Sequence, residues 1–332
     1  MLTFPPTGGP PGTGKTKTLC EATLQILDKQ PTASVLLCAP SDTAADTLAL
    51  RLGKHLRPGQ LLRLNSTTRT FAEVPESLVM FCHIVEHEGS SSFGMRAWHD
   101  RRRGPGVVTA THDVSMLLRA RCSNIDFQRL RQFMDQGLRA HQGPSDPDLH
   151  WTHLLVDEAG QGTEAEMMAA IACVLPLAST TSEPVFCLCG DAAQLGPRIT
   201  SHEARSHGLD WSLFERLLSR KIYADALKSA RLNQKKQDRG NGTTQPASPI
   251  LCALRRNYRA CNPHLIMVPS ALFYHDALLP CAPHKEELNT WHGLPNASVP
   301  MLFENVDSPD VWVDEGVSWH SESCSSSSIS WF

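Results

Sequence analysis

Four short hydrophobic runs recur along the chain, and each ends in small, polar or acidic residues. They are SVLLCAP (34–40), GVVTATH (106–112), HLLVDEA (153–159) and VFCLCGD (185–191). Runs of this length, rich in leucine and β-branched residues, are typical of buried parallel strands. Stretches with helical character lie before the first run and between the runs, including 16–30 and 41–56. This alternation predicts an α/β fold with a doubly wound parallel sheet, whose chemistry would lie at the carboxyl ends of the strands.

Polar segments interrupt this pattern and indicate how the chain is divided. Residues 66–104 are polar and irregular, so we expect an insertion on the sheet. Residues 227–249 are charged and then rich in Gly, Thr and Pro, which is typical of a flexible linker. A packed pattern resumes over 250–305, and the serine-rich end at 306–332 is predicted to be a disordered tail.

Composition narrows the class of protein. The 332 residues are 41% hydrophobic and 20% charged, which supports a substantial core and an expectation of about two domains. A net charge of -3 gives no general attraction to nucleic acid, so such binding would need a local basic groove. The 11 cysteines form no C-x-x-C pair, which favours buried reduced thiols. The sequence has neither a signal-peptide pattern nor an apolar stretch of about 18 residues, which favours a soluble cytoplasmic protein.

A glycine-rich loop near the start carries the first chemical signal. It matches the pattern G-x-x-x-x-G-K-[ST], in which backbone amides and the positive end of the following helix bind phosphate. Lys15 would neutralise the β- and γ-phosphates, and the Thr16 hydroxyl would be a ligand of Mg²⁺. The motif therefore predicts a P-loop NTPase that binds ATP and Mg²⁺. The residues of the loop are Gly9, Pro10, Pro11, Gly12, Thr13, Gly14, Lys15 and Thr16.

The support of this loop is less clear from the sequence. A phosphate-binding loop works only when a buried strand precedes it. Eight residues precede Gly9, and two of them, Pro5 and Pro6, have no N–H to donate to a sheet. Leu2–Phe4 could form a strand remnant. We therefore expect that nothing adequate within this chain holds the loop in place.

Two further strand ends supply acidic and amide groups. In LLVDEAGQ, Asp157 ends a hydrophobic run where a carboxylate can hold Mg²⁺, and Glu158 is placed to take a proton from the attacking water. In CGDAAQLGP, Asp191 and Gln194 would lie beside this pair. Gln194 could contact the γ-phosphate or orient water. A phosphate-binding loop and a DE pair alone would also be compatible with a kinase or a ring ATPase. The GD-x-x-QL element is found in fewer P-loop enzymes and speaks against these two classes.

Taken together, the motifs resemble the superfamily 1 helicases of the Upf-like branch. The resemblance depends on GPPGTGKT, CAPSDTAADTLALRL, VVTATH, LLVDEAGQ, GDAAQLGP and NYRACNP…PSALFY, and it covers residues 8–305. The DEAG, NYR and SALFY elements are most similar to the Mov/Armitage/SDE-type silencing helicases. The resemblance implies a first RecA-like ATP-binding domain at 1–226, a linker at 227–249 and the beginning of a second RecA-like domain at 250–305.

Roles follow from the resemblance residue by residue. Tyr258 would stack on the base of ATP, and Arg259 would link the γ-phosphate to domain closure together with Gln194. Asp157 and Glu158 would act as metal ligand and base. Single-stranded RNA would be the polymer, with DNA as an alternative, and Arg101–Arg103 could add electrostatic attraction, although a solvated loop cluster is the simpler interpretation. The implied nucleic-acid contacts are Pro40, Ser41, Asp42, Thr109, Thr111 and Pro197.

The resemblance also implies motifs that this sequence does not contain. The family has an adenine-reading glutamine before the loop, and a glycine-glutamine element and a γ-phosphate arginine after the second domain begins. We therefore interpret the sequence as a helicase core truncated at both ends. The expected function is an ATP-dependent RNA helicase in RNA silencing or RNA turnover, with silencing or decay proteins as partners. The alternative is a truncated nucleotide- or RNA-binding module that does not hydrolyse ATP.

Overall fold

The computed structural model divides the chain into two compact units, Met1–Arg259 and Ala260–Phe332. The structure describes residues 6–66, 68–87, 90–93, 106–138, 149–178, 180–225, 251–260, 262–283, 287–296, 298–302, 310–313 and 317–320. The sequence-based boundaries of two helicase domains stay a prediction.

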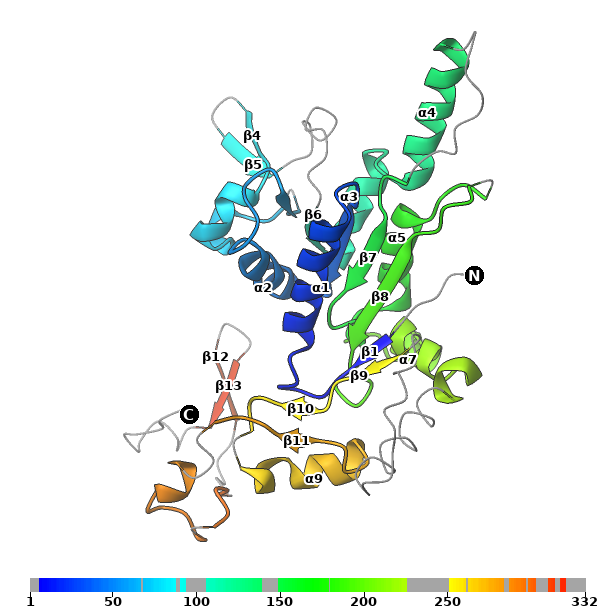
Figure 1. Ribbon diagram of the computed structural model, residues 1–332. Helices are drawn as coiled ribbons and strands as arrows, with labels where there is room; N and C mark the ends of the chain where they lie inside the picture. Colours follow the sequence, from blue (N-terminus) through cyan, green and yellow to red (C-terminus); the bar gives the residue numbers. More distant parts are fainter. Residues whose placement is uncertain are drawn as a thin grey trace. The chain divides into compact units, whose positions relative to one another are not determined.

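A seven-stranded sheet forms the centre of the first unit, with the strand order β3-β6-β2-β7-β8-β1-β9 (Figure 1). All neighbouring strands in it are parallel, so their carboxyl ends meet at one edge. The predicted α/β class is confirmed, and the four predicted strands correspond to β2, β6, β7 and β8. The strands are β1 (Pro6–Gly8), β2 (Val35–Ala39), β3 (Leu61–Leu64), β6 (Gly106–Ala110), β7 (His153–Val156), β8 (Val185–Gly190) and β9 (Cys252–Ala253).

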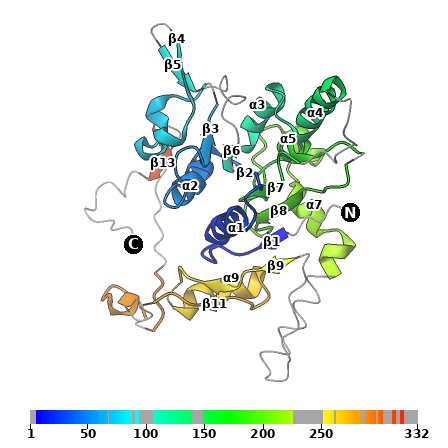
Figure 2. The same ribbon diagram turned by 45° about the horizontal axis from the view of Figure 1, so that its top comes forward.

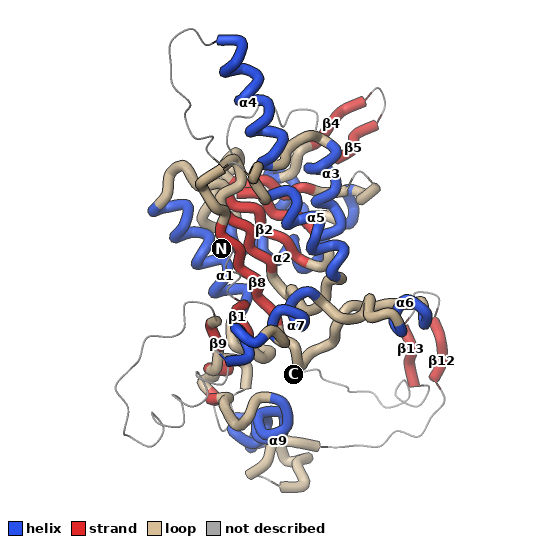
Figure 3. The backbone as a smooth tube through the Cα atoms, turned by 90° about the vertical axis from the view of Figure 1, so that its right-hand side faces the viewer, coloured by secondary structure: helices blue, strands red, loops and turns tan. Residues whose placement is uncertain are grey.

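Helices cover both faces of the sheet, as the alternation of side chains along β2 shows. Leu37 and its alternate neighbours pack with α1 (Lys15–Lys29) and α2 (Asp42–Leu52). Leu36 and Cys38 point the other way and pack with α3 (Val114–Arg119) and α5 (Glu164–Val174). Figures 2 and 3 show the strands between these two groups of helices. Because both faces are buried, β2 is hydrophobic at every position.

Further helices, turns and strands complete this unit. The helices are α4 (Asn124–Leu138), α6 (His202–Ser206) and α7 (Leu213–Leu218), and the 3₁₀ turns are η1 (Phe71–Glu73), η2 (Glu76–Phe81) and η3 (Thr111–Asp113). The remaining strands are an antiparallel pair, β4 (Ile84–His87) and β5 (Ser90–Phe93), and the two-residue β10 (Arg256–Asn257).

The strand before the phosphate-binding loop corrects an expectation from the sequence. β1 pairs in parallel with β8 on one side and with β9 on the other. The Gly9 amide donates to the Gly190 carbonyl at 3.2 Å, and the Leu254 amide donates to the Gly8 carbonyl at 2.8 Å. A proline lacks a donor but keeps its carbonyl, so Pro6 is compatible with a strand start. The loop is therefore held in place within this chain, by partners that are distant in the sequence.

The segment predicted as an irregular insertion contributes to the core where it is described. Val74, Leu78 and Phe81 are buried among the side chains of α1, α2 and β2. Leu78 is completely buried, at 0% exposure. The start of the predicted insertion is therefore part of the packed sheet layer. The hairpin of β4 and β5 follows it, and residues 94–105 lie outside the described part.

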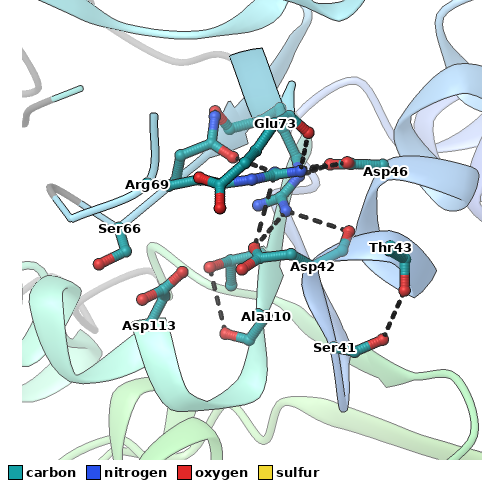
Figure 4. Close-up of polar contacts among 12 residues, drawn as sticks. Ser41, Asp42, Thr43, Asp46, Ser66, Arg69, Glu73, Ala110 and Asp113 are labelled. Carbon is teal, nitrogen blue, oxygen red and sulfur yellow. Dashed lines mark hydrogen bonds and ion pairs between the residues drawn. The ribbon is translucent and has the colours of Figure 1, made fainter. Parts of the chain in front are cut away.

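A buried ion network joins β3, α2 and the turn after β3 (Figure 4). Arg63 is fully buried, and its Nε donates to Asp46 Oδ1 at 2.8 Å. Arg69 donates to both Asp46 oxygens, at 3.0 and 2.6 Å. Burial by itself would raise the pKa of Asp46, but the hydrogen bonds and charges of Arg69 and Arg63 outweigh it and hold that pKa below its usual value.

Most described cysteines of this unit agree with the predicted buried thiols. All described cysteines are free, and Cys20, Cys38, Cys122, Cys173 and Cys189 are buried. Burial raises the pKa of Cys20 to about 11, so this thiol stays protonated at neutral pH. The expectation is wrong for Cys252, which is exposed.

The second unit consists of short elements. Its helix α9 (Pro263–Phe273) begins after Asn262, whose side chain accepts from the His264 amide at 2.9 Å. The unit also contains β11 (Leu279–Pro280), η4 (Glu287–Thr290) and an antiparallel pair, β12 (Asp310–Val313) and β13 (Val317–His320). This pair lies inside the stretch for which the sequence predicts disorder. Among the described helices of the whole chain, none has the length and apolar character needed to cross a membrane.

Replacing Asp46 should destabilise the first unit strongly. We expect Asp46→Ala to lower the free energy of unfolding by about 3–5 kcal/mol, because it leaves two guanidinium groups buried without their partner. The depressed pKa means that this stabilisation is complete at neutral pH and is lost only as the pH falls below the unfolded-state value of about 3.9. Urea unfolding at pH 7 measures the change.

The matched control is Glu21→Gln, at an exposed position of α1 that makes one surface hydrogen bond to Gln25. Its effect should stay within about 0.5 kcal/mol. An equal effect of the two substitutions would contradict the structural role of the network.

Candidate functional site

The glycine-rich loop connects β1 directly to α1. Gly12 and Gly14 have φ angles of 78° and 86°, a region in which a side chain is strained. Thr13 is buried and its hydroxyl donates to the Pro10 carbonyl at 2.7 Å, which closes the loop on itself. No side chain caps the start of α1. Its first amides, which have no partner within a helix, are therefore available to an anion.

Lys15 points from the first turn of α1 to the acidic pair after β7. Only 6% of Lys15 is exposed, and its Nζ lies 3.6 Å from Glu158 Oε1. Asp157 is 3% exposed and accepts a hydrogen bond from the Thr16 side chain. The structure thus brings together the four residues that the sequence analysis assigned to phosphate, metal and base.

The two carboxyl groups are held in an environment that favours protonation. Burial raises the pKa of Asp157, although the Thr16 hydrogen bond, the Glu158 amide and the Lys15 charge act against it. Burial also raises the pKa of Glu158, where Lys15 opposes the shift and the Asp157 charge adds to it. The backbone of Glu158 has a φ of 46°, a left-handed conformation that is uncommon for a non-glycine residue. Such backbone strain is common at functional sites.

The end of β8 adds a third polar group to the same edge. The Gln194 side chain donates to Asp191 Oδ2 at 2.7 Å, and Asp191 Oδ1 accepts from the Ala193 amide at 3.0 Å. Asp191 is buried, and its charge contributes to the raised pKa of Glu158. A Cβ at Gly160 would come within 3.2 Å of the Asp191 carbonyl. The glycine therefore allows the DEAG turn to lie against the end of β8.

A segment far along the sequence braces the loop from the side. Asn257 is 6% exposed, and its Nδ2 donates to the Pro11 carbonyl at 2.8 Å. The Tyr258 amide donates to the Gly12 carbonyl, also at 2.8 Å. The Arg259 amide in turn donates to Asn257 Oδ1 at 2.9 Å. The side chain of Asn257 thus holds the loop, a role that was not predicted from the sequence, although Asn257 belongs to the quoted NYR element.

Two exposed side chains of this segment, those of Tyr258 and Arg259, have predicted roles at the nucleotide. Tyr258 is 58% exposed, and Arg259 is exposed as well. Both residues follow Asn257, whose side chain contacts the loop. The hydrogen bonds given above between this segment and the loop use the Asn257 side chain and the Tyr258 backbone, and neither the Tyr258 nor the Arg259 side chain. The proposed contacts of Tyr258 with a base and of Arg259 with a γ-phosphate stay predictions.

The predicted nucleic-acid residues between β2 and α2 are partly accessible. Ser41 is exposed, and its hydroxyl caps α2 by accepting from the Ala44 amide at 3.3 Å. Pro40 and Asp42 are partly exposed. Asp42 is already engaged, because its Oδ1 accepts from Arg63 at 2.7 Å.

The other predicted nucleic-acid residues are buried. Thr109 and Thr111 have 0% exposure, and their hydroxyls donate to the carbonyls of Ala110 and Ala39 at 3.2 and 3.3 Å. Pro197 is buried too. These positions stay predictions, and a contact through the threonine hydroxyls would require both to leave their present partners. The arginine cluster at 101–103 lies outside the described residues.

The donor set of the loop and acidic pair fits a magnesium nucleotide. The uncapped start of α1 and the buried ammonium of Lys15 provide positive potential for phosphates. The Thr16 hydroxyl and the Asp157 carboxylate, which touch each other here, are oxygen ligands of the kind that Mg²⁺ takes. Glu158 faces Lys15 and is partly exposed, so it is accessible to a ligand bound beside the loop.

Comparisons with known proteins agree with this geometry. Residues 6–94 match the family model described as "AAA domain". The chain is 33% identical over 318 residues to human RNA helicase Mov10l1, covering 94% of this chain and 22% of that protein. It is 32% identical over 285 residues to the probable RNA helicase armi of Drosophila melanogaster, covering 84% of this chain and 21% of the relative.

Two further likenesses are more distant. A regulator of nonsense transcripts 1 homolog from Neurospora crassa is 33% identical over 219 residues, covering 63% of this chain and 18% of the relative. The crystal structure of the arterivirus nonstructural protein 10 helicase matches with a TM-score of 0.41 and 14% identity, over 85% of this chain and 41% of that one. The chain thus spans about a fifth of the length of the curated relatives it matches. By its motifs, its sheet and its curated relatives, the chain belongs to the superfamily 1 helicases of the Upf-like branch, beside the Mov10 and armi proteins.

Proposed function

We propose that this chain is the nucleotide-binding part of an ATP-dependent RNA helicase, in which ATP hydrolysis drives movement along single-stranded RNA. The observation that carries the proposal is the contact of Lys15 with Glu158, 3.6 Å apart, beside the paired Thr16 and Asp157. Curated relatives that cover most of this chain are named RNA helicases, which supports the choice of polymer.

Each of the four residues that meet here would then have a distinct role. The Lys15 ammonium would leave Glu158 for the β- and γ-phosphates of ATP. Thr16 and Asp157 would hold Mg²⁺, which supplies neutralisation of charge on the phosphate oxygens. Glu158, released from Lys15, would accept the proton of the attacking water, and its raised pKa makes it a stronger proton acceptor than an ordinary carboxylate.

Coupling to RNA would use the neighbouring groups. Gln194, held by Asp191, lies at the edge of the acidic pair and would respond to the γ-phosphate. Asn257 fixes the loop backbone, so Tyr258 and Arg259 would move with the loop when nucleotide enters. Pro40, Ser41 and Asp42 would contact the RNA backbone at the same edge of the sheet. We further propose that the helicase acts in the cytoplasm, in RNA silencing or RNA turnover.

Hydrolysis by the purified 332-residue chain, with and without single-stranded RNA, tests the function. We expect RNA-stimulated turnover, and we expect Glu158→Gln to reduce kcat by about 10²–10⁴-fold while ATP binding remains, because general-base catalysis has this magnitude. Lys15→Ala should lose Mg²⁺-dependent ATP binding. Binding without turnover in the unmodified chain would favour the alternative, a nucleotide- and RNA-binding module that does not hydrolyse ATP.

Glycine substitutions test the loop geometry. Gly12→Ala should weaken nucleotide binding, because its Cβ would lie 2.8 Å from Arg259 Cβ and 2.9 Å from Asn257 Oδ1. The matched control is Gly208→Ala, which has a similar φ of 83° and nothing within 4 Å of the added Cβ. Isothermal titration with a non-hydrolysable ATP analogue measures both. Equal affinities of the two variants would show that the Asn257 brace does not shape the loop.

The acid side of the pH profile reports on Glu158. A general base must be deprotonated, so kcat should fall as the pH drops through the pKa of Glu158. Because burial raises that pKa, the fall should begin above the usual carboxylate value of about 4.3. Rates at saturating ATP from neutral pH downward, with circular dichroism to verify folding, give the profile. A constant rate down to about pH 4.5 would contradict the assignment of the base.

A further inference from the structure

Three side chains with metal-binding atoms meet at a second place on the carboxyl edge of the sheet. Strands β2 and β6 are neighbours, and their last residues, Ala39 and Ala110, are partners in the register. The chain after β2 enters α2 at Asp42, and the chain after β6 enters η3 with His112 and Asp113. The topology therefore brings two carboxylates and an imidazole together from positions about seventy residues apart in the sequence.

The distances between these groups suit a shared ion better than direct hydrogen bonds. One ligand atom of each residue lies within 4.8 Å of the others. His112 Nε2 lies 4.0 Å from Asp42 Oδ2 and 3.6 Å from Asp113 Oδ1. Hydrogen bonds of this type span about 2.7–3.2 Å. Ligands bound tetrahedrally at about 2.1 Å from a metal ion are about 3.4 Å apart.

Asp113 provides an independent reason to place a ligand here. It is only 4% exposed; the Ser66 amide donates to its carboxyl group, and among the described residues its Oδ2 has no hydrogen-bond partner. A buried carboxylate oxygen without a partner is costly, so native proteins rarely leave one. Figure 4 shows Asp113 near both Ser66 and Asp42. A cation between Asp113 and Asp42 would satisfy this oxygen.

The buried ion network orients the second carboxylate. Asp42 Oδ1 accepts from Arg63 Nη2 at 2.7 Å, while its Oδ2 is the oxygen nearest to His112. Arg63 is itself fixed by Asp46 and completely buried. Partners of this kind commonly orient the ligands of metal sites from behind. The local carboxylates of Asp42, Asp46 and Asp113 outnumber the two guanidinium groups, so negative charge remains for a cation.

We propose that Asp42, His112 and Asp113 bind a divalent first-row metal ion. Carboxylate and imidazole ligands together suit ions such as Mn²⁺ and Zn²⁺. Three protein ligands leave positions for water on the side where His112 is 48% exposed. The ion would join the start of α2 to η3, and it is distinct from the Mg²⁺ proposed at Thr16 and Asp157, which follow β1 and β7. The inference does not depend on ATP hydrolysis.

Titration of the nucleotide-free 332-residue chain with Mn²⁺, followed by electron paramagnetic resonance, tests the site. Mn²⁺ is the probe because soft thiolates, including the exposed Cys252, prefer other metals. We expect one bound ion with a ¹⁴N coupling from the imidazole. His112→Ala should remove the coupling and weaken binding about tenfold or more, and Asp113→Asn should weaken it similarly. The half-exposed position of His112 makes its variant the safer one for folding.

Two control variants separate this site from other sources of binding. His202→Ala removes an exposed imidazole of α6, and Thr16→Ala removes a ligand of the proposed nucleotide-site metal. Both should keep the Mn²⁺ site and its ¹⁴N coupling. The proposal is overturned if the folded chain binds no Mn²⁺, if binding survives His112→Ala unchanged, or if binding disappears only in Thr16→Ala. None of these outcomes bears on turnover, so the proposed ATPase is judged separately.

Discussion

The placement of β1 between β8 and β9 is the constraint on which the site depends. The glycines of the loop have little preference for one conformation, so the loop amides point at a phosphate only if both ends of the loop are fixed. Here the Gly9 amide is bonded to Gly190, and the Gly8 carbonyl accepts from Leu254. The same pairing aligns β1 with β8 and, through it, with β7, so that Lys15 and Glu158 leave the sheet at one edge.

Three cationic side chains near that edge, Lys15, Arg63 and Arg69, are less than a tenth exposed, and each has a carboxylate partner. Lys15 faces Glu158, and Arg63 and Arg69 share Asp46. Such pairs stabilise less than their distances suggest, because both members lose hydration. They do make the geometry specific, since removing one partner leaves an uncompensated charge. Under the proposed function the Lys15–Glu158 pair would also be exchangeable, because a phosphate would replace Glu158 as the partner of Lys15. The ion pairs of Arg63 and Arg69 with Asp46 have no such alternative partner, and their role is to stabilise the fold.

The two candidate sites share one origin in the topology. A parallel sheet sends every strand end to the same edge, so loops far apart in the sequence become neighbours there. β1 and β7 bring the nucleotide residues together, and β2 and β6 bring Asp42 to His112. The proposed RNA contacts Ser41 and Asp42 lie at the second place, so nucleotide and polymer would act on one edge. Asp42 belongs to both the proposed RNA contacts and the proposed metal ligands.

Features that depend on local patterns could be predicted from the amino-acid sequence. Buried strands must be hydrophobic on both faces, so β2, β6, β7 and β8 could be predicted, and the phosphate loop and DE pair follow strict spacing rules. Tertiary structure decided what depends on distant partners. β1 could not be predicted because both of its partners, β8 and β9, lie far along the sequence, and the contact of Asn257 could not because the Pro11 carbonyl that it binds is 246 positions away. Likewise, only the register of β2 with β6 brings His112 to Asp42, because spacing along the chain contains no information about which strand ends become neighbours.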